Sequence, residues 1–206
     1  NWLTIEITVV VLLVVLFAYL KTQLSVDRPG KLQHTFELIA EFVRAQAEEI
    51  VGHGSDRFLA FFGSIFIFVL FMNLIGIIPT LESPTMFTMV PCGLAVATFV
   101  YYNAAGLKAN GLWGYTKHFL GPMLWLAPVM LPIEIVSHFA RPLSLTIRLY
   151  ANMFAGEHVT STFLGLTYLV IPALFMGLHI FVSILQAYIF SLLAMIYVGG
   201  AVAHEH

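Results

Sequence analysis

The chain has 206 residues, of which 60% are hydrophobic and only 10% are charged. Soluble domains average about 45–50% apolar and about 25% charged residues, so this composition excludes an ordinary soluble domain, and it also excludes a disordered chain. Nine Lys and Arg against eleven Asp and Glu give a net charge of −2, which provides no basic surface for nucleic acid. A single cysteine, Cys92, allows neither an intrachain disulfide nor a cysteine cluster for a metal.

Several apolar segments are long enough to cross a bilayer, whose hydrocarbon core of about 30 Å requires roughly 20 apolar residues. They predict an all-α membrane protein with five to six hydrophobic helices, and we expect one membrane domain over residues 1–206. In chain order, the expected segments are a first transmembrane helix over 3–20, a transmembrane hairpin over 58–79 and 86–105, and long helices within 122–203.

Residues 32–51 differ from these segments because apolar and polar side chains recur there with the period of a helix. The apolar positions share one face and are Leu32, Phe36, Ile39, Val43 and Ile50. The polar positions share the other face and are His34, Glu37, Glu41, Arg44 and Glu48. Since membrane spans flank this segment closely, the pattern favours an amphipathic helix at the inner membrane interface over a linker helix exposed to water.

The distribution of Lys and Arg predicts the orientation in the membrane, because cytoplasmic loops carry an excess of these residues. Residues 21–57 contain five of them and residues 106–120 contain two, whereas residues 81–85 contain none. We therefore expect the N-terminus outside, the loops 21–57 and 106–120 inside, the loop 79–85 outside and the C-terminus inside.

Ionisable residues interrupt the apolar region 122–203, although a charge at the centre of a membrane costs from about 2.5 to more than 10 kcal/mol. If residues 131–156 form one helix, with a possible kink site at Pro142, helical spacing aligns one polar stripe along it. The members of that stripe are Glu134, Ser137, His138, Arg141, Ser144, Arg148 and Asn152. A second stripe on the last helix can meet Glu157 or Arg148 if the two helices pack antiparallel, and it consists of His179, Ser183 and Gln186.

The residue types in these stripes suggest an ion path. Arg148 does not lose its proton in proteins and is therefore a fixed positive charge. The groups that can exchange protons are Glu134, Glu157 and His179. The groups that can hold water or orient the guanidinium are Asn152, Ser144 and Gln186. A fixed cation that lies between titratable groups can act as an electrostatic barrier, and this pattern therefore predicts two aqueous half-paths separated by Arg148.

Structural alternatives remain open for several of these residues. Arg148 could pair with Glu157 or extend to an interface, and Glu134 could cap a helix that begins near Pro132. Arg141 is more typical of a structural or interfacial cation. The remaining polar residues of the spans are expected to be packing residues and are Asn73, His138 and His158.

Four segments together resemble subunit a of the F-type ATP synthases. The segment RPLSLTIRLYANMFAGE at 141–157 resembles the family signature (S)LxxRLxxNMxAGE, and LQAYIF at 185–190 resembles the core of the family's terminal helix. The segments PGKLQHTFELIAEFV at 29–43 and FMNLIGIIP at 71–79 resemble the family's interfacial helix and second span. The resemblance covers most of the chain.

This resemblance implies a stator channel beside a rotating ring of c subunits, with no catalysis by this chain alone and no cofactor. Arg148 would be the essential arginine that faces the ring carboxylate. The outer half-channel would contain Glu157, His179 and Gln186. Glu134 would belong to the inner half-channel, and the polar residues near the arginine would be Asn152 and Ser144. The last two helices would be long and strongly tilted against the ring.

The resemblance also implies partners and a location. The partners would be the c-ring, the peripheral-stalk b subunits, the remaining ATP synthase subunits and the lipid bilayer, without nucleic acid. The location would be an energy-transducing membrane, and the pattern of Glu157 together with His179 favours the bacterial plasma (inner) membrane. The main alternative function is a proton- or sodium-coupled secondary transporter, which predicts a substrate cavity between broken helices. A haem-bearing subunit is a weaker alternative, because its axial histidines would have to face one another.

Overall fold

The structure, a computed structural model, describes residues 2–23, 30–52, 54–78, 83–120, 127–166 and 170–202. These residues form helices and short connections, and they include no β-strand, which confirms the expected all-α membrane protein. The α-helices are α1 (Trp2–Gln23), α2 (Lys31–Val51), α3 (Asp56–Leu74), α4 (Met89–Leu120), α5 (Ala127–Leu166) and α6 (Val170–Val202). Two short 3-10 helices, η1 (Ile75–Ile77) and η2 (Pro84–Met86), lie between α3 and α4.

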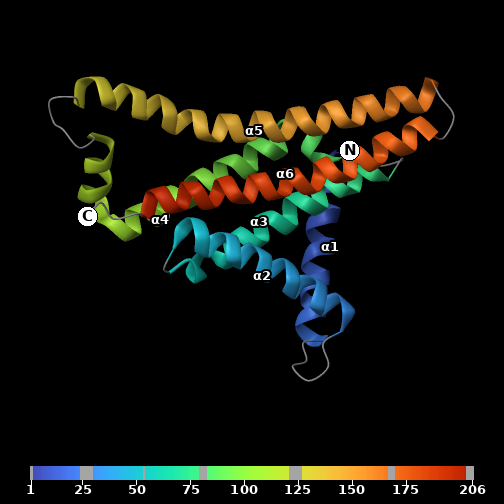
Figure 1. Ribbon diagram of the computed structural model, residues 1–206, viewed down its shortest axis with the longest axis horizontal. Coiled ribbons are helices and arrows are strands. Elements are labelled where there is room, and N and C mark those ends of the chain that lie inside the picture. The colour runs from blue at the N-terminus through green and yellow to red at the C-terminus, as the bar shows by residue number, and fades with distance from the viewer. Residues whose placement is uncertain are drawn as a thin grey trace.

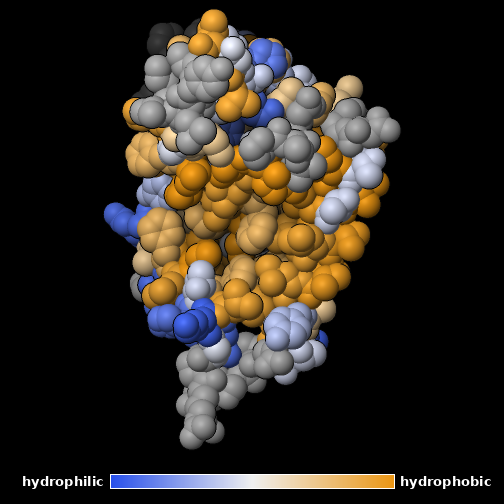
Figure 2. All heavy atoms as spheres, turned by 90° about the vertical axis from the view of Figure 1, so that its right-hand side faces the viewer, coloured by the Kyte–Doolittle hydropathy of each residue, from blue (hydrophilic) through white to orange (hydrophobic). Residues whose placement is uncertain are grey.

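Four described helices are long and apolar enough to cross a membrane, over Leu3–Thr22, Asp56–Ile77, Met89–Gly111 and Ala173–Val202. The surface around them is correspondingly apolar, and Figure 2 shows hydrophobic side chains covering the centre of one face with hydrophilic ones toward its margins. The chain is therefore a multi-pass membrane protein. Parts of the expected segments and loops lie outside the described residues, namely 24–29, 53, 79–82, 121–126, 167–169 and 203.

The last two helices are much longer than an upright membrane span requires. With 40 and 33 residues, α5 and α6 extend about 60 Å and about 50 Å, whereas the hydrocarbon core is about 30 Å thick. Figure 1 shows them side by side along the longest dimension of the molecule, crossing the direction of α1. This arrangement agrees with the expected tilt of the two long helices, and α5 continues as a helix through Pro132 and Pro142.

Two glycines with positive φ define helix ends. Gly52 adopts φ 77° directly after α2, where its N–H donates to Glu48 O at 3.1 Å. Gly111 adopts φ 69° within α4 and separates the long span from a short terminal helix up to Leu120. Left-handed values of this kind favour glycine because it has no Cβ. The prediction of a loop over 106–120 is therefore wrong. These residues continue α4, and the helix is interrupted once, at Gly111.

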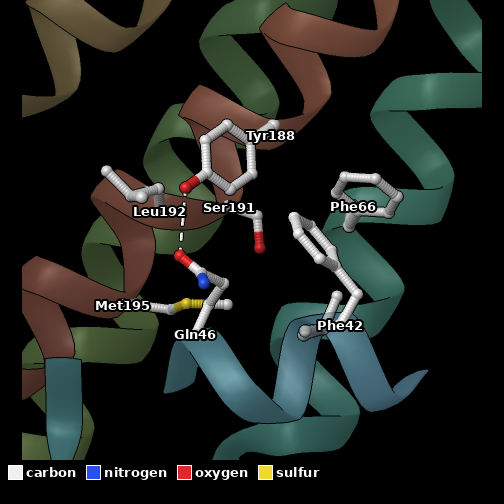
Figure 3. A pocket seen from close by; sticks show the side chains of 8 residues that line it. Phe42, Gln46, Phe66, Tyr188, Ser191, Leu192 and Met195 are labelled. Carbon is white, nitrogen blue, oxygen red and sulfur yellow. Dashed lines mark hydrogen bonds between the residues drawn. The ribbon is translucent and has the colours of Figure 1, made fainter. Parts of the chain in front are cut away.

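The amphipathic helix α2 packs its apolar face against α3 and α6. Val43 and Ala47 are buried, whereas the polar positions that define its other face are exposed. A hydrogen bond of 3.0 Å from the Tyr188 hydroxyl to Gln46 Oε1 joins α6 to α2, and Phe42 lies against the Tyr188 ring (Figure 3). Leu32, expected on the apolar face, is instead exposed at the start of the helix.

The inner face of α5 is fixed by three buried apolar side chains at a spacing of four residues, Leu145, Leu149 and Met153. They join a core to which α6 and α3 contribute most of the other buried side chains. The fully buried side chains from α6 and α3 include Ala187, Phe190, Ala194, Val198, Phe62, Val69 and Met72. This packing sets which side of α5 can present Arg148 to the outside of the chain.

Candidate ion path

Arg148 lies near the middle of α5, at the border between the buried face and the exposed face. Its side chain is half-buried, and no carboxylate of the described residues forms an ion pair with it. The described contacts therefore do not support the alternative that Arg148 pairs with Glu157. The neighbouring positions on the exposed face carry the small residues Ser144, Ala151 and Ala155. Small residues allow a helix of another chain to approach closely.

Glu157 is held by the connection between α3 and α4. Its Oε1 accepts a hydrogen bond of 2.5 Å from the backbone N–H of Ser83, which lies 74 residues earlier in the chain. The Ser83 hydroxyl donates to Met72 O at 2.9 Å and lies 2.6 Å from the hydroxyl of Thr85, which donates to Asn73 Oδ1 at 2.7 Å. We call Asn73, Ser83, Thr85, Glu157 and His179 the outer polar cluster, after the outer half-channel in which the sequence analysis expected Glu157 and His179.

His179 completes this cluster from α6. The imidazole is buried and lies so close to Gly156 that a Cβ added there would come within 2.8 Å of Nδ1. Within the described structure, His179 Nε2 and Asn73 Nδ2 are buried without a hydrogen-bond partner. Buried polar atoms left without protein partners are typical binding sites for ordered water. The cluster therefore offers two buried polar atoms, close to Glu157, that ordered water could bind.

The second polar stripe meets α5, as expected for antiparallel packing. Asn152 donates to Gln186 Oε1 at 2.9 Å, one turn of α5 beyond Arg148. Gln186 and Ser183 are buried on the same side of α6 as His179. Side chains of α6 thus connect the outer polar cluster to the neighbourhood of Arg148.

Glu134 lies near the opposite end of α5, about 34 Å from Glu157 along the helix axis. Its Oε1 accepts a hydrogen bond and ion pair from Arg141 Nη2 at 3.4 Å, and the guanidinium of Arg141 lies 5.5 Å from the centroid of the Tyr197 ring. Since α5 begins at Ala127, Glu134 is not in its first turn, and the capping interpretation is wrong. Arg141 has the structural contacts that its sequence context favoured.

The histidines of α5 make aromatic contacts. His138 is buried, with Nδ1 at 3.4 Å from the Tyr102 hydroxyl and its ring at 4.8 Å from that of Phe99. His158 is exposed and lies 4.1 Å from the ring of Phe154. These contacts agree with packing roles. Ser144, by contrast, is a member of the polar stripe whose side chain is exposed rather than part of the packed surface.

Comparison with known proteins gives the family. The profile of the family described as ATP synthase A chain matches residues 2–199. The chain is 64% identical to "ATP synthase subunit a" of Solibacter usitatus (strain Ellin6076) over 206 residues, which is 100% of this chain and 88% of that protein. It is 51% identical to the protein of the same name from Koribacter versatilis (strain Ellin345), over 100% of this chain and 84% of that protein. This chain belongs to the ATP synthase subunit a family.

Membership in the subunit a family gives the chain its role. Subunit a is the proton-conducting membrane component of the F-type ATP synthase, and it is not catalytic by itself. The chain is therefore part of the ATP synthase complex, as its signature at 141–157 implied.

The sequence analysis did not predict that Ser83 and Thr85 belong to the outer polar cluster. Ser83 and Thr85 lie in a short connection between two apolar spans, and Asn73, expected to pack helices, binds Thr85 instead. The available signal was the sequence SPT, which places two hydroxyl residues around a proline at the membrane boundary of a subunit a chain.

We expect the variant Gly156→Ala to slow ATP-driven proton pumping by about tenfold or more, because its Cβ would displace the imidazole of His179 and small misplacements are costly in proton transfer. Acidification of membrane vesicles that contain the whole ATP synthase measures the rate. Gly165→Ala, on the same helix with nothing within 4 Å of an added Cβ, is the matched control and should pump normally. Equal rates in both variants would contradict the close contact of Gly156 with His179.

Proposed function

We propose that this subunit forms two proton half-paths separated by Arg148, and that a carboxylate on an adjacent rotating ring carries protons between them. The observation that supports this most directly is the position of Arg148. Its guanidinium has no carboxylate partner within the described chain and is flanked by Ser144, Ala151 and Ala155 on the exposed face of α5. A cation in a membrane requires a counter-charge, and this surface leaves room for one from another chain.

The outer half-path is proposed to contain Glu157, His179 and Gln186. Glu157 and His179 belong to the outer polar cluster, and Gln186 continues toward Arg148 through its hydrogen bond to Asn152. A proton that enters from outside would reach the ring carboxylate along this side of α6. Asn152 and Ser144 are proposed to hold water near the guanidinium.

The inner half-path is proposed to lie near Glu134. This acid is half-buried beside Arg141, at the end of α5 that lies about 34 Å from Glu157 along the axis. The ion pair with Arg141 keeps a charged, hydrated group at that end of the helix. Protons released from the ring would leave through this region.

The proposed mechanism depends on the different costs of charged and neutral carboxyl groups in lipid. A protonated carboxyl enters hydrocarbon at far lower cost than a carboxylate, so proton uptake at the outer path lets the ring turn. When the carboxyl returns to Arg148 from the other side, the field of the guanidinium favours the anion, and the proton leaves through the inner path. Each proton contributes about 2.3 kcal/mol per 100 mV of membrane potential, so several protons are needed for each ATP.

The finer partners and the location follow from the same proposal. The partners are the c-ring and the peripheral-stalk b subunits, in one membrane domain whose residues 122–203 carry the path. The membrane is the bacterial plasma membrane, since the named relatives come from bacteria. The Lys and Arg distribution supports an outer N-terminus and an inner C-terminus.

A cross-linking experiment tests the proposed neighbour of Arg148. A cysteine replaces Ile147, which is exposed on the same face as Ser144 and Ala151, in a complex where Cys92 is changed to serine and a ring cysteine lies beside the ring carboxylate. We expect a disulfide between the two chains after mild oxidation. A cysteine at the exposed Val15 of α1 is the control and should remain unlinked to the ring. Cross-linking at Val15 but not at position 147 would overturn the proposal.

A further inference from the structure

The segment Ser83–Met86 is anchored far more firmly than a connection between two spans requires. Ser83 and Thr85 are fully buried, and their hydroxyls contact Met72 O and Asn73 Oδ1 at the end of α3. Asn73 is itself fully buried. Three polar side chains thus fix the position of the Ser83 backbone relative to α3. We call Ser83–Met86 the η2 strap.

The backbone N–H of Ser83, in the strap, forms a hydrogen bond with Glu157 of α5, an acid of the proposed path. The Ser83 N–H donates to Glu157 Oε1, and a hydrogen bond to an ionised acceptor is shorter and stronger than one between neutral groups. Gly76 makes room for this contact, because a Cβ there would overlap Glu157 Oε1 and lie 2.8 Å from Ser83 Cβ. Gly156, next to Glu157, makes room for His179 in the same way.

We propose that the η2 strap is a positioning element of the proton path, in which the Ser83 amide holds the Glu157 carboxylate at the end of the outer polar cluster. The inference rests on the proposed role of Glu157 in proton transfer. An amide N–H is a fixed donor that does not take part in proton exchange, so it orients the carboxylate without competing for the transported proton. Through Thr85 and Asn73, the strap also fixes the amide of Asn73, whose Nδ2 has no partner in the described structure.

Two substitutions at position 83 separate the backbone donor from the side chain. Ser83→Pro removes the N–H, and the native φ of −64° at this residue already matches the value that proline requires. Ser83→Ala removes only the hydroxyl and keeps the N–H. We expect ATP-driven proton pumping in vesicles with the whole complex to fall about tenfold in the proline variant and clearly less in the alanine variant, because about 1.4 kcal/mol corresponds to tenfold and a hydrogen bond to a charged group contributes about that much or more.

A pair of glycine variants tests the same contact without removing the donor. Gly76→Ala would push the Glu157 carboxylate away from the Ser83 amide, whereas Gly63→Ala, on the preceding helix α3, meets nothing within 4 Å. We expect Gly76→Ala to lower pumping like Ser83→Pro and Gly63→Ala to leave it unchanged. This pair keeps the inference testable if the proline variant fails to assemble.

The pH profile of pumping separates positioning from a general loss of structure. The titratable groups on the elements around Glu157 include His179 on α6, His158 on α5 and Glu6 on α1, which packs against η2, and further along these elements Glu134, His138 and Asp56. None of these titratable groups is substituted in the four variants. A shift of the pH profile of pumping in Ser83→Pro and Gly76→Ala, but not in Ser83→Ala and Gly63→Ala, would therefore support the positioning role of the η2 strap. An undisplaced profile with normal rates in both test variants would overturn it. If Arg148→Ala still abolishes pumping and Glu157→Gln still slows it in that case, the proposed function stands and only the strap fails.

Discussion

Replacing Arg148 with alanine should change two proton currents in opposite directions. ATP-driven pumping should fall to the level of vesicles without ATP synthase, because the ring carboxylate loses the fixed charge that releases its proton. Passive proton leak should rise, because the electrostatic barrier between the two half-paths is removed. Fluorescence quenching of a pH-sensitive dye in inverted vesicles measures both currents on one sample.

Arg148→Lys is the matched control for this prediction. Lysine keeps the charge but lacks the planar, five-donor geometry of the guanidinium, so pumping should be impaired while the leak stays low. A misassembled complex would lower pumping in both variants without this difference in leak. Normal ATP-driven pumping in Arg148→Ala would refute the central role of this residue.

Replacing Glu157 with glutamine should slow ATP-driven pumping by about tenfold or more at neutral pH. Glutamine has nearly the same shape and its amide oxygen can still accept the Ser83 N–H, but it cannot take up and release a proton, and a positioned proton-transfer group contributes about 100-fold or more to a rate. The measurement is the initial rate of vesicle acidification at constant amounts of assembled complex.

Glu48→Gln provides the comparison for the Glu157 variant. Glu48 is exposed on the polar face of α2, away from the residues of the outer polar cluster. The same chemical change there should leave pumping within error of the unmodified complex. An unchanged rate in Glu157→Gln would remove this acid from the proton path.

The fold was largely accessible from the sequence because long apolar segments and one amphipathic period determine the helices. The period of α2 placed Val43 on the buried face correctly. The helical structure at the end of α4 could not be predicted from the sequence, because Gly111 and the residues around it have a composition that suits either a loop or a broken helix. Only the backbone angles distinguish these two outcomes.

The contacts of the candidate site could be predicted from the sequence only where they follow helical spacing. The pairing of Glu134 with Arg141 spans two turns of one helix, and the contact of Asn152 with Gln186 follows from two stripes on adjacent helices. The bond between the Ser83 amide and Glu157 joins residues 74 positions apart. A backbone donor carries no residue-type signal, so no pattern of side chains could have indicated it.

The slant of α5 has a mechanical consequence. About 34 Å of helix separates Glu134 from Glu157, and α5 runs across the direction of the apolar helix α1 (Figure 1), so under the proposed mechanism the two acids differ in sideways position as well as in depth. The membrane potential, which acts across the bilayer, would therefore act between two half-paths that lie at different positions along the circumference of the c-ring. Under the proposed mechanism, the direction in which this helix leans sets the sense of rotation, and reversing the voltage reverses the torque.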